Sequence, residues 1–530
     1  MEMMDTKKGI RLGEGRSGFE TMEPERVTDL VWNQKRYLAG GRSVSPSPAS
    51  DGDEDPSEME PRICSKWSRR ESIHPMSDGA ASPFAGVKWS IVLFGVVYKV
   101  VLSLPGFSEV VEILFRDLSN LKNLKYLSMD ETNLNISFLQ NIGLLTSLES
   151  LSLRSCNLEG TLPDQGPLHL PTHSHQNLTS LEFSNNFLHG NIPIQVGAYL
   201  PMLRNLNISI NDFDGCIPSS IGDMKQLSFL DLSYNKLSSG ILEHLAESCI
   251  NLQYLVLSNN SLEGQIFSAA HFNLKYLMRL QLYGNQFIGK IPECLSNSSS
   301  YLKGLYLGDN HLSSRIPSWL GNMSQLVDLK MPNNHLECPI PLEFCQLQNL
   351  QVLNLAENNI YGDLPSCFSP PQIQQVHLSK NRLEGQLKDA FFNSSSLVTL
   401  DLGYNRFNGG IPNLIGRLSN LIYLILTHNN LEGEVPHLLC NLERLRLIDL
   451  SHNNFSGQIP HCLDMTALHG DFSTATEPMR NEEDVPFEPN NASYFFKTSF
   501  APLRKEETVV HNEKDILLLP RKNSYLHVWS

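Results

Sequence analysis

Residues Leu280–Pro292 read LQLYGNQFIGKIP and contain every element of a pattern that fills most of this 530-residue chain. The pattern is two leucines separated by one residue, an asparagine, a leucine or phenylalanine, a glycine, and then often Ile-Pro. It recurs about every 23 to 25 residues, in about 14 copies between Leu127 and Pro460. A period this short, repeated this often, predicts a solenoid in which each copy forms one turn. The asparagine stands at Asn186, Asn211, Asn235, Asn260, Asn285, Asn310, Asn334, Asn358, Asn381, Asn405, Asn429 and Asn453, with Thr132 and Cys156 at the same point of two earlier copies.

Each residue type in the pattern has a physical role. Alternating leucines place both side chains on one face of a short strand, so successive turns lay parallel strands side by side at roughly 4.8 Å. The asparagine amide both donates and accepts hydrogen bonds, and we expect it to pair backbone groups that the turn leaves open. Thr132 can replace part of this function, whereas we expect Cys156 to do so poorly. The glycine permits a backbone conformation that is costly for other residues, and Ile-Pro predicts extended chain.

The repeats resemble the plant-specific leucine-rich repeat, and this resemblance covers about two thirds of the chain. It is carried by Leu206–Pro218, Leu280–Pro292, Leu305–Pro317, Leu424–Pro436 and Ile448–Pro460. The resemblance implies an α/β fold, a curved leucine-rich-repeat solenoid with a parallel concave sheet and a second short sheet at the G-x-I-P stretch. The most similar class is the ectodomain of plant receptor-like proteins, which are cell-surface receptors without a kinase of their own.

This resemblance also implies a function. Receptor-like proteins bind a peptide or protein ligand on the concave face and signal through an adaptor or co-receptor kinase, in defence or development, at the plasma membrane or outside the cell. A secreted cell-wall protein or enzyme inhibitor of the polygalacturonase-inhibitor type is the alternative, and an intracellular scaffold is the third. About ten repeats is usual for those inhibitors, so the longer array here favours the receptor.

The composition and motifs narrow the remaining classes. A net charge of −15, without a basic stripe, argues against nucleic acid as a partner. The sequence contains no phosphate-binding loop, nucleophile elbow, kinase motif or set of metal ligands at workable spacing, so we predict neither an enzyme nor a cofactor. His173 and His175 could bind a metal, but they lie in the longest insertion of the array, which we interpret as a solvated loop.

The chain divides into four segments. Residues 1–88 are rich in Pro, Ser and charge without apolar periodicity, which predicts disorder. Residues 89–117 are interpreted as an apolar capping segment or a degenerate first repeat; a displaced signal sequence and a membrane anchor are alternatives, although the apolar run is shorter than the roughly 20 residues of a span. The array occupies 118–463, and the polar tail 464–530 resembles the family's non-repeat island. We recognise no signal peptide or transmembrane helix, so a truncated chain is an open alternative.

Aromatic and basic residues gather on neighbouring turns of the predicted concave face. Residues beside the paired leucines point to that face because side chains alternate along a strand. Aromatic residues and arginine most often anchor protein interfaces, so we predict a ligand site there, with scattered surface aromatics as the alternative. The predicted residues are Phe229, Tyr234, Tyr254, Arg279, Tyr283, Tyr306 and Lys330.

Two pairs of cysteines lie at equivalent points of adjacent turns. Cys345 and Cys440 each follow their asparagine by about eleven positions, and Cys367 and Cys462 follow theirs by about nine. Neighbouring turns lie roughly 5 Å apart, so Cys345–Cys367 and Cys440–Cys462 can meet the roughly 4.4 to 6.8 Å Cα separation of a disulfide. Two pairs of buried thiols are the alternative. Disulfides would indicate an oxidising compartment.

The first prediction concerns glycosylation. Sequons begin at Asn135, Asn177, Asn207, Asn259, Asn297, Asn322, Asn393, Asn454 and Asn491. A chain this rich in Asn and Ser should hold roughly six by chance, so their number alone is weak support for a secretory route. After expression in plant cells, glycosidase digestion should increase the gel mobility of the chain. An unchanged mobility would count against secretion.

Overall fold

The computed structural model describes residues 88–94, 96–103, 123–142, 145–162, 177–238, 242–267, 272–298, 300–387 and 390–463. The predicted disordered segment up to residue 87 and the tail 464–530 lie outside the described residues. So do His173, His175 and the sequon at Asn491.

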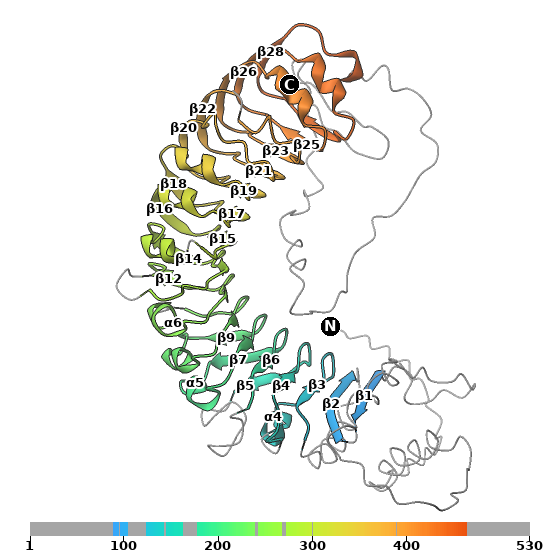
Figure 1. Cartoon of the computed structure of the whole chain (residues 1–530), viewed down its shortest axis with the longest axis vertical. Helices are drawn as coiled ribbons and strands as arrows, with labels where there is room; N and C mark the ends of the chain where they lie inside the picture. Colours follow the sequence, from blue (N-terminus) through green and yellow to red (C-terminus); the bar gives the residue numbers. More distant parts are fainter. Residues whose placement is uncertain are drawn as a thin grey trace, which may run out of the picture. The chain divides into compact units, whose positions relative to one another are not determined.

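One long sheet runs through the described repeats, with a strand from every turn (Figure 1). Its neighbours are parallel from β2 onwards, and the register never shifts: Leu280 pairs with Leu255 on one side and Leu305 on the other. The strands are β1 (Lys88–Phe94), β2 (Val96–Ser103), β3 (Tyr126–Ser128), β4 (Ser150–Ser152), β6 (Ser180–Glu182), β8 (Asn205–Asn207), β10 (Phe229–Asp231), β11 (Tyr254–Val256), β13 (Arg279–Gln281), β15 (Gly304–Tyr306), β17 (Asp328–Lys330), β19 (Val352–Asn354), β21 (Gln375–His377), β23 (Thr399–Asp401), β25 (Tyr423–Ile425) and β27 (Leu447–Asp449). This arrangement confirms the leucine-rich-repeat solenoid.

The apolar segment predicted to begin at residue 89 contributes to the same sheet. Strands β1 and β2 form an antiparallel pair, and β2 pairs in parallel with β3. The strand pair therefore stands at the N-terminal end of the sheet. Its role as a cap stays a prediction.

The G-x-I-P side of the repeats carries short parallel strands, which the resemblance placed in one second sheet. The described residues form three such sheets instead. They comprise β5 (Glu159–Thr161), β7 (Phe187–Asn191) and β9 (Asp212–Asp214); β12 (Glu263–Gly264), β14 (Gln286–Gly289), β16 (His311–Arg315) and β18 (His335–Glu337); and β20 (Tyr361–Asp363), β22 (Arg382–Gln386), β24 (Arg406–Gly409), β26 (Asn430–Glu434) and β28 (Asn454–Ser456).

The last interruption has a local cause. Cys338 replaces the usual glycine with a φ of 75°, and Pro339, which follows it, has no amide to donate to a ladder. Only a single bridge, from Glu337 to Asn359, continues across this point.

Short helices complete the turns on the side away from the long sheet (Figure 1). They are α4 (Ser137–Ile142), α5 (Val196–Tyr199) and α6 (Leu242–Ser248), with 3₁₀ helices η2 (Ser219–Asp223), η3 (Glu293–Ser298), η4 (Ser318–Asn322), η5 (Leu342–Gln346), η6 (Asn413–Arg417), η7 (His437–Asn441) and η8 (His461–Leu463). The core lies between the sheet and these helices. Leu280, Leu282 and Phe287 are fully buried there, because each is covered by the same positions of the neighbouring turns.

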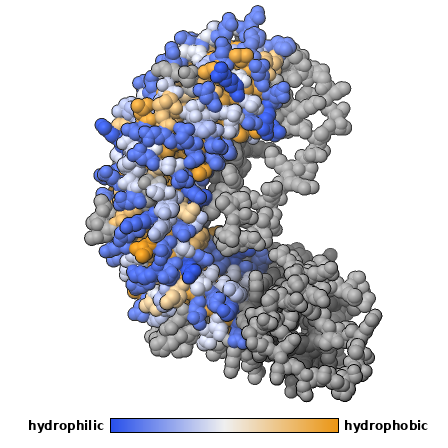
Figure 2. Space-filling view, in the orientation of Figure 1, coloured by the Kyte–Doolittle hydropathy of each residue, from blue (hydrophilic) through white to orange (hydrophobic). Residues whose placement is uncertain are grey.

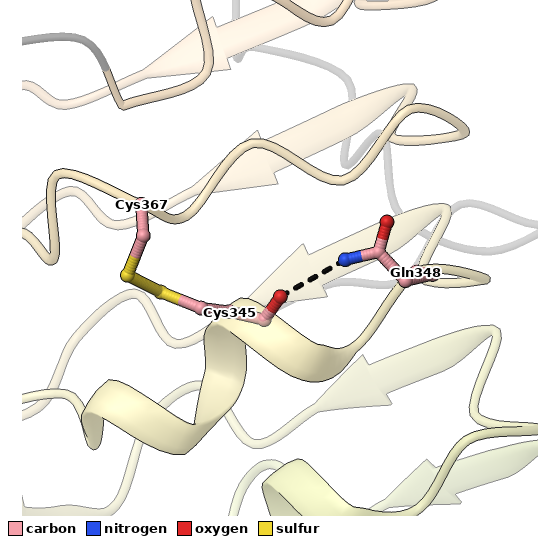
Figure 3. Close-up of a disulfide and its surroundings, with 3 residues drawn as sticks. All are labelled: Cys345, Gln348 and Cys367. Atoms are coloured by element: carbon pink, nitrogen blue, oxygen red, sulfur yellow. Dashed lines mark hydrogen bonds between the residues drawn. A yellow bond between two sulfur atoms is a disulfide. The ribbon is translucent and has the colours of Figure 1, made fainter.

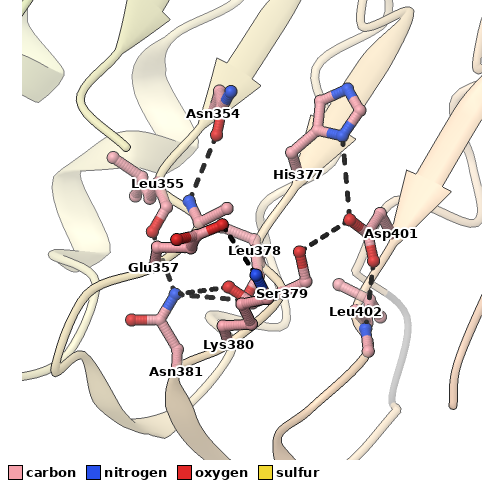
Figure 4. Close-up of polar contacts among 12 residues, drawn as sticks. Asn354, Leu355, Glu357, His377, Leu378, Ser379, Lys380, Asn381, Asp401 and Leu402 are labelled. Carbon is pink, nitrogen blue, oxygen red and sulfur yellow. Dashed lines mark hydrogen bonds and ion pairs between the residues drawn. The ribbon is translucent and has the colours of Figure 1, made fainter. Parts of the chain in front are cut away.

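The repeated asparagines form a ladder of buried hydrogen bonds, which Figure 4 shows at Asn381. Its Oδ1 accepts the Ile360 amide at 3.0 Å, and its Nδ2 donates to the carbonyls of Leu355 and Leu378 at 2.9 and 3.1 Å. Each asparagine therefore joins its own turn to the preceding one. The residue before it lies in the left-handed region, as Lys380 does with a φ of 54°.

Cys156 replaces the asparagine less poorly than expected. Its thiol donates to the Met129 carbonyl at 3.0 Å, and the Leu134 amide, which an asparagine would accept, donates to the Cys156 carbonyl at 2.9 Å. Burial raises the pKa of this thiol to about 12, so it stays protonated and keeps its donor. The backbone supplies the acceptor that cysteine lacks.

Both cysteine pairs are bonded, as their spacing indicated. Cys345 of η5 and Cys367 lie on adjacent turns with their Cα atoms 5.6 Å apart (Figure 3). Cys440 of η7 and Cys462 of η8 have the same separation. Each bridge joins two turns on the helical side of the array, across the solenoid from the long sheet.

The second prediction concerns the asparagine ladder. Asn310 is 5% exposed and bonds the Phe287 amide and the carbonyls of Leu282, Leu307 and Gly308. Replacing it by alanine leaves these buried groups unpaired, and we expect a loss of roughly 2 to 4 kcal/mol of unfolding free energy. The Phe287 amide should also exchange faster with solvent deuterium.

Asn349→Ala is the matched control, because Asn349 makes an exposed bond to the Ser324 carbonyl of the preceding turn. Chemical denaturation should show a loss of less than about 1 kcal/mol for this variant. Equal losses for the two variants would contradict the ladder's role.

Candidate ligand-binding face

We define the sheet face as the surface formed by the first and third residues of each strand in the long sheet and by the two residues before each ladder asparagine. In β10, for example, Leu230 points into the core and is fully buried, whereas Phe229 and Asp231 lie half-buried on the face. Alternation along the strand produces this arrangement. The core therefore constrains the residues between the face positions and leaves the face positions themselves open to variation.

Tyr306 is the centre of a polar and aromatic cluster on this face. Its hydroxyl donates to Oδ2 of Asp328 at 2.6 Å, and the Arg279 guanidinium and Lys330 ammonium lie 5.3 and 5.6 Å from its ring centroid. Both cations are attracted by the negative face of the ring. Gly304 makes room for this arrangement, because a Cβ there would lie 2.6 Å from the Tyr306 ring. We call these five residues the Tyr306 cluster.

Burial affects the ionisation of this cluster. Desolvation lowers the pKa of Lys330, although the nearby Asp328 carboxylate opposes that shift. Desolvation likewise raises the pKa of the Tyr306 hydroxyl, and the Asp328 charge adds to the rise. The Tyr306 hydroxyl therefore stays protonated and donates a hydrogen bond to Asp328, while the Arg279 and Lys330 cations lie near this single carboxylate.

Two further aromatic pairs lie on the neighbouring turns. The hydroxyl oxygens of Tyr234 and Tyr283 are 2.8 Å apart, and the rings of Phe229 and Tyr254 have centroids 6.0 Å apart. Tyr234 is 46% exposed, whereas Phe229, Tyr254 and Tyr283 are half-buried. Each ring thus has a fixed neighbour on an adjacent or nearby turn.

The structure brings the predicted ligand residues together on successive turns, from β10 to β17. Among these aromatic residues Tyr234 is exposed, whereas the other rings are half-buried on the face and partly covered by each other and by charged neighbours. Sequence reasoning missed Gly304 and Asp328. The available signal was the strand register, which places Gly304 beside Arg279 and Asp328 on the strand next to that of Tyr306. Ligand binding by these residues stays a prediction.

Two carboxyl groups lie on the same face, nearer the N-terminal end of the array. Glu182 of β6 accepts the Asn207 amide at 3.0 Å, and Asp231 of β10 accepts the Ser233 hydroxyl at 2.6 Å. Desolvation raises the pKa of both carboxyls, although these hydrogen bonds oppose the rise. Ionised carboxylates at these positions therefore lack part of the stabilisation that water would give them.

A stack of rings lies on the sheet face at its C-terminal end. Tyr404, His428 and His452 each precede a ladder asparagine, and successive ring centroids are 4.1 and 3.9 Å apart. Desolvation and the neighbouring His452 lower the pKa of His428. Sequence reasoning missed this stack. An aromatic or imidazole ring directly before the ladder asparagine on three successive turns was the signal.

The sequons differ in accessibility. Asn207 lies within β8, half-buried on the sheet face, and Asn259 is also half-buried. Those at Asn135, Asn177, Asn297, Asn322, Asn393 and Asn454 are exposed. A glycan would be attached to Nδ2, the atom through which Asn207 donates to Glu182, so a glycan at Asn207 would compete with that hydrogen bond. Glycosylation of any of them stays a prediction.

Neither a metal site nor a membrane span is found among the described residues. Within those ranges, no three His, Cys, Asp or Glu residues lie together in a way that could hold a metal ion. In the same part of the chain, no helix has the length and apolar character needed to cross a bilayer.

Comparison with known families identifies the repeats. A model described as "Leucine rich repeat" matches residues 371–431, and a second model of the same description matches 147–166, 226–248, 251–271, 301–323, 349–370 and 444–465. "Receptor like protein 21" of Arabidopsis thaliana is 42% identical over 83 residues, or 16% of this chain and 8% of that protein. The chain thus spans only a small part of the length of such relatives.

Solved structures give the same fold. The "Plant peptide hormone receptor RGFR1 in complex with RGF2" has a TM-score of 0.56 and 27% identity, over 66% of this chain and 58% of that one. The "TDR receptor" has a TM-score of 0.59 and 27% identity, over 65% of this chain and 63% of that one.

The third prediction concerns the Asp231 carboxyl. Its raised pKa means that its stabilising contribution is complete below the unfolded value near pH 4 and is lost as the pH rises through the folded value. Asp231→Asn keeps the acceptor for Ser233 but removes the charge. We expect this variant to gain on the order of 1 kcal/mol over the wild type at pH 7, and less at pH 3.5.

Asp449→Asn is the matched control, because Asp449 makes the same bonds to the amide and hydroxyl of Ser451, at 3.0 and 2.6 Å, on the last strand of the long sheet. Denaturant unfolding at both pH values measures the effect. A pH-independent difference, or an equal gain for the control, would exclude desolvation of Asp231 as its cause.

Proposed function

Because this chain is a plant leucine-rich-repeat receptor-like protein, we propose that its array is the ligand-recognition part of a cell-surface receptor. The ligand is a peptide or a protein segment, and it binds the sheet face between β10 and β17. The Tyr306 cluster is the observation that carries this proposal.

The Tyr306 cluster is not needed by the solenoid. The leucines on either side of Tyr306 bury themselves fully against neighbouring turns. Arg279 and Lys330, by contrast, are partly removed from water on a face that small polar residues occupy elsewhere, as at Ser128 and Ser152. Aromatic rings flanked by cations are typical anchors of protein interfaces, where tyrosine and arginine contribute most of the binding energy. Recognition explains their presence better than folding does.

The relatives support the type of ligand. The structural neighbour RGFR1 is a plant peptide hormone receptor in complex with RGF2, and it shares the array's fold over 66% of this chain. A peptide is proposed here because the sheet face offers an extended row of anchors, one per turn, rather than a closed cavity. The likeness to RGFR1 supports that choice without specifying the peptide's sequence.

The cysteines support the compartment. Both bridges, Cys345–Cys367 and Cys440–Cys462, would be reduced in the cytosol and persist in an oxidising environment. We therefore place the array outside the cell or at its surface. A partner kinase would transmit the signal, and the role is in defence or development.

Figure 2 shows apolar residues interspersed among hydrophilic ones on the side of the array in view. A mixed surface of this kind remains soluble while it presents individual side chains to a partner.

The fourth prediction tests the proposed site with a bead-bound library of random decapeptides, selected on the full chain. The wild type should enrich specific sequences, and Tyr254→Ala combined with Tyr306→Ala should weaken binding of an enriched peptide at least tenfold, because interface tyrosines are worth roughly 1 to 2 kcal/mol each.

The control is Tyr276→Ala combined with Tyr301→Ala. These two tyrosines are 48% and 47% exposed and form an edge-to-face pair in the turns leading into β13 and β15, away from the sheet face. Their removal should change binding by less than about twofold. Loss of binding in the control with retention in the Tyr254/Tyr306 variant would show that the site is elsewhere.

A further inference from the structure

Ile210 occupies a backbone conformation that does not suit its side chain. It precedes the ladder residue Asn211 and has a φ of 53°, in the left-handed region. A β-branched residue is an outlier there, because its Cβ crowds the neighbouring carbonyl. Burial does not offset this strain, since the side chain is 48% exposed.

Five of the other described turns show what this position accommodates readily. The residue before the ladder position has a positive φ on each of them. Asparagine, aspartate or glycine, which tolerate that conformation best, occur at Asn185, Asn259, Gly284, Asp309 and Asn333. Folding alone would favour asparagine at position 210. Strain of this kind indicates a contact that the array itself does not make.

Tyr234 occupies the same place on the next turn. It also has a φ of 53° and is 46% exposed. The Ile210 amide donates to the Ser233 carbonyl at 2.9 Å, which places Ile210 against the turn that carries Tyr234. The Tyr283 hydroxyl, 2.8 Å from that of Tyr234, fixes where the ring lies. Ile210 and Tyr234 are therefore exposed at the same position of adjacent turns, at the edge of the sheet face. We call these two residues the apolar step.

Acidic residues lie at this region of the sheet face, and basic residues lie further along the array. Asp231 lies on β10, on the same turn as Tyr234, and Glu182 lies on β6, on the turn before that of Ile210. The groups of Ser184, Asn207 and Ser233 that donate hydrogen bonds to these two carboxyls are neutral. Arg279 and Lys330 stand on β13 and β17, further along the array. Desolvation raises the pKa of both carboxyls, so a cation brought by a ligand would stabilise their ionised forms.

We propose that the ligand is a peptide segment in which an aliphatic or aromatic residue stands beside a basic residue, with an acidic residue about three positions away. The apolar residue contacts Ile210 and Tyr234, the basic residue faces Asp231 and Glu182, and the acidic residue faces Arg279. This inference rests on the proposed function and deepens it.

The spacing follows from the register of the sheet. Strands β10 and β13 are separated by one strand, β11, and pair with it in register. Two steps of roughly 4.8 Å separate Asp231 from Arg279 along the array, a distance that about three residues of extended peptide cover at roughly 3.3 Å each. A ligand segment that lies along the array thus matches both charges and the apolar step within about five residues.

The fifth prediction uses opposite signs for stability and binding. Ile210→Asn relieves the strain, so the thermal unfolding midpoint should rise by about 1 to 3 °C, while binding of peptides selected by the wild type from the random decapeptide library falls at least tenfold. Arg279→Glu should replace the acidic residue in the selected peptides by a basic one.

Glu131→Asn is the matched control. Glu131 holds the same position on an earlier turn, has a φ of 60° and is exposed, so its substitution relieves strain away from the apolar step. This variant should gain a similar shift in midpoint and select the same peptides as the wild type. If Ile210 had a purely structural role, Ile210→Asn would also select the same peptides as the wild type.

Each remaining outcome is decisive. If Ile210→Asn selects the same peptides as the wild type, or unfolds at a lower temperature, the proposal for Ile210 is wrong and the proposed function stands. Enriched peptides without the apolar, basic and acidic spacing would refute the ligand chemistry alone. If the wild type enriches no peptide, peptide recognition by the sheet face fails, and the ligand chemistry fails with it.

Discussion

The hydrogen bonding of one asparagine per turn is the constraint on which the rest of the array depends. A turn tight enough to return the chain to the sheet leaves backbone amides and carbonyls pointing at one another across a dry interior. Asn310 shows the solution: one amide accepts the Phe287 N–H of the preceding turn and donates to the carbonyls of both turns. Because the side chain must reach those groups, the strands stay in register, even across the insertion between Cys156 and Asn186.

A backbone fixed in this way separates folding from recognition. The leucines between face positions carry the core and are buried from Leu181 to Leu424 with little variation. Face residues can then change without loss of the core, and they do: serine occupies the face at β4, a tyrosine with two cations at β15. Gly304 illustrates how far this extends, because the missing Cβ on one face position allows the Tyr306 ring on another to lie across it.

Sequence reasoning predicted whatever depends on the period, and missed what depends on contacts between turns. Spacing alone placed Cys345 against Cys367 and the aromatic positions on successive turns. It could not show that Tyr306 is held by Asp328, since that bond depends on the rotamer of a side chain. Nor could it separate Ile210 from any other surface isoleucine, because the left-handed backbone at that point is visible only in the folded turn. The break between the second and third of the short sheets was missed for the same local reason, at Cys338 and Pro339.

Residues that make folding less favourable, through backbone strain or loss of hydration, provide a second way to locate a binding surface. This criterion is independent of which residue types are common at interfaces. Ile210 is strained although its side chain is exposed. Asp231 loses hydration, and the Ser233 groups that donate hydrogen bonds to it are neutral. Desolvation also disfavours the charge of Lys330. All three lie on the face between β8 and β17, whereas the leucine columns beneath them carry no such cost. These three costs differ in kind, in backbone, carboxylate and ammonium, and they lie on one stretch of the face. Under the proposed function, a ligand that relieves this desolvation and contacts the exposed isoleucine would account for all three costs.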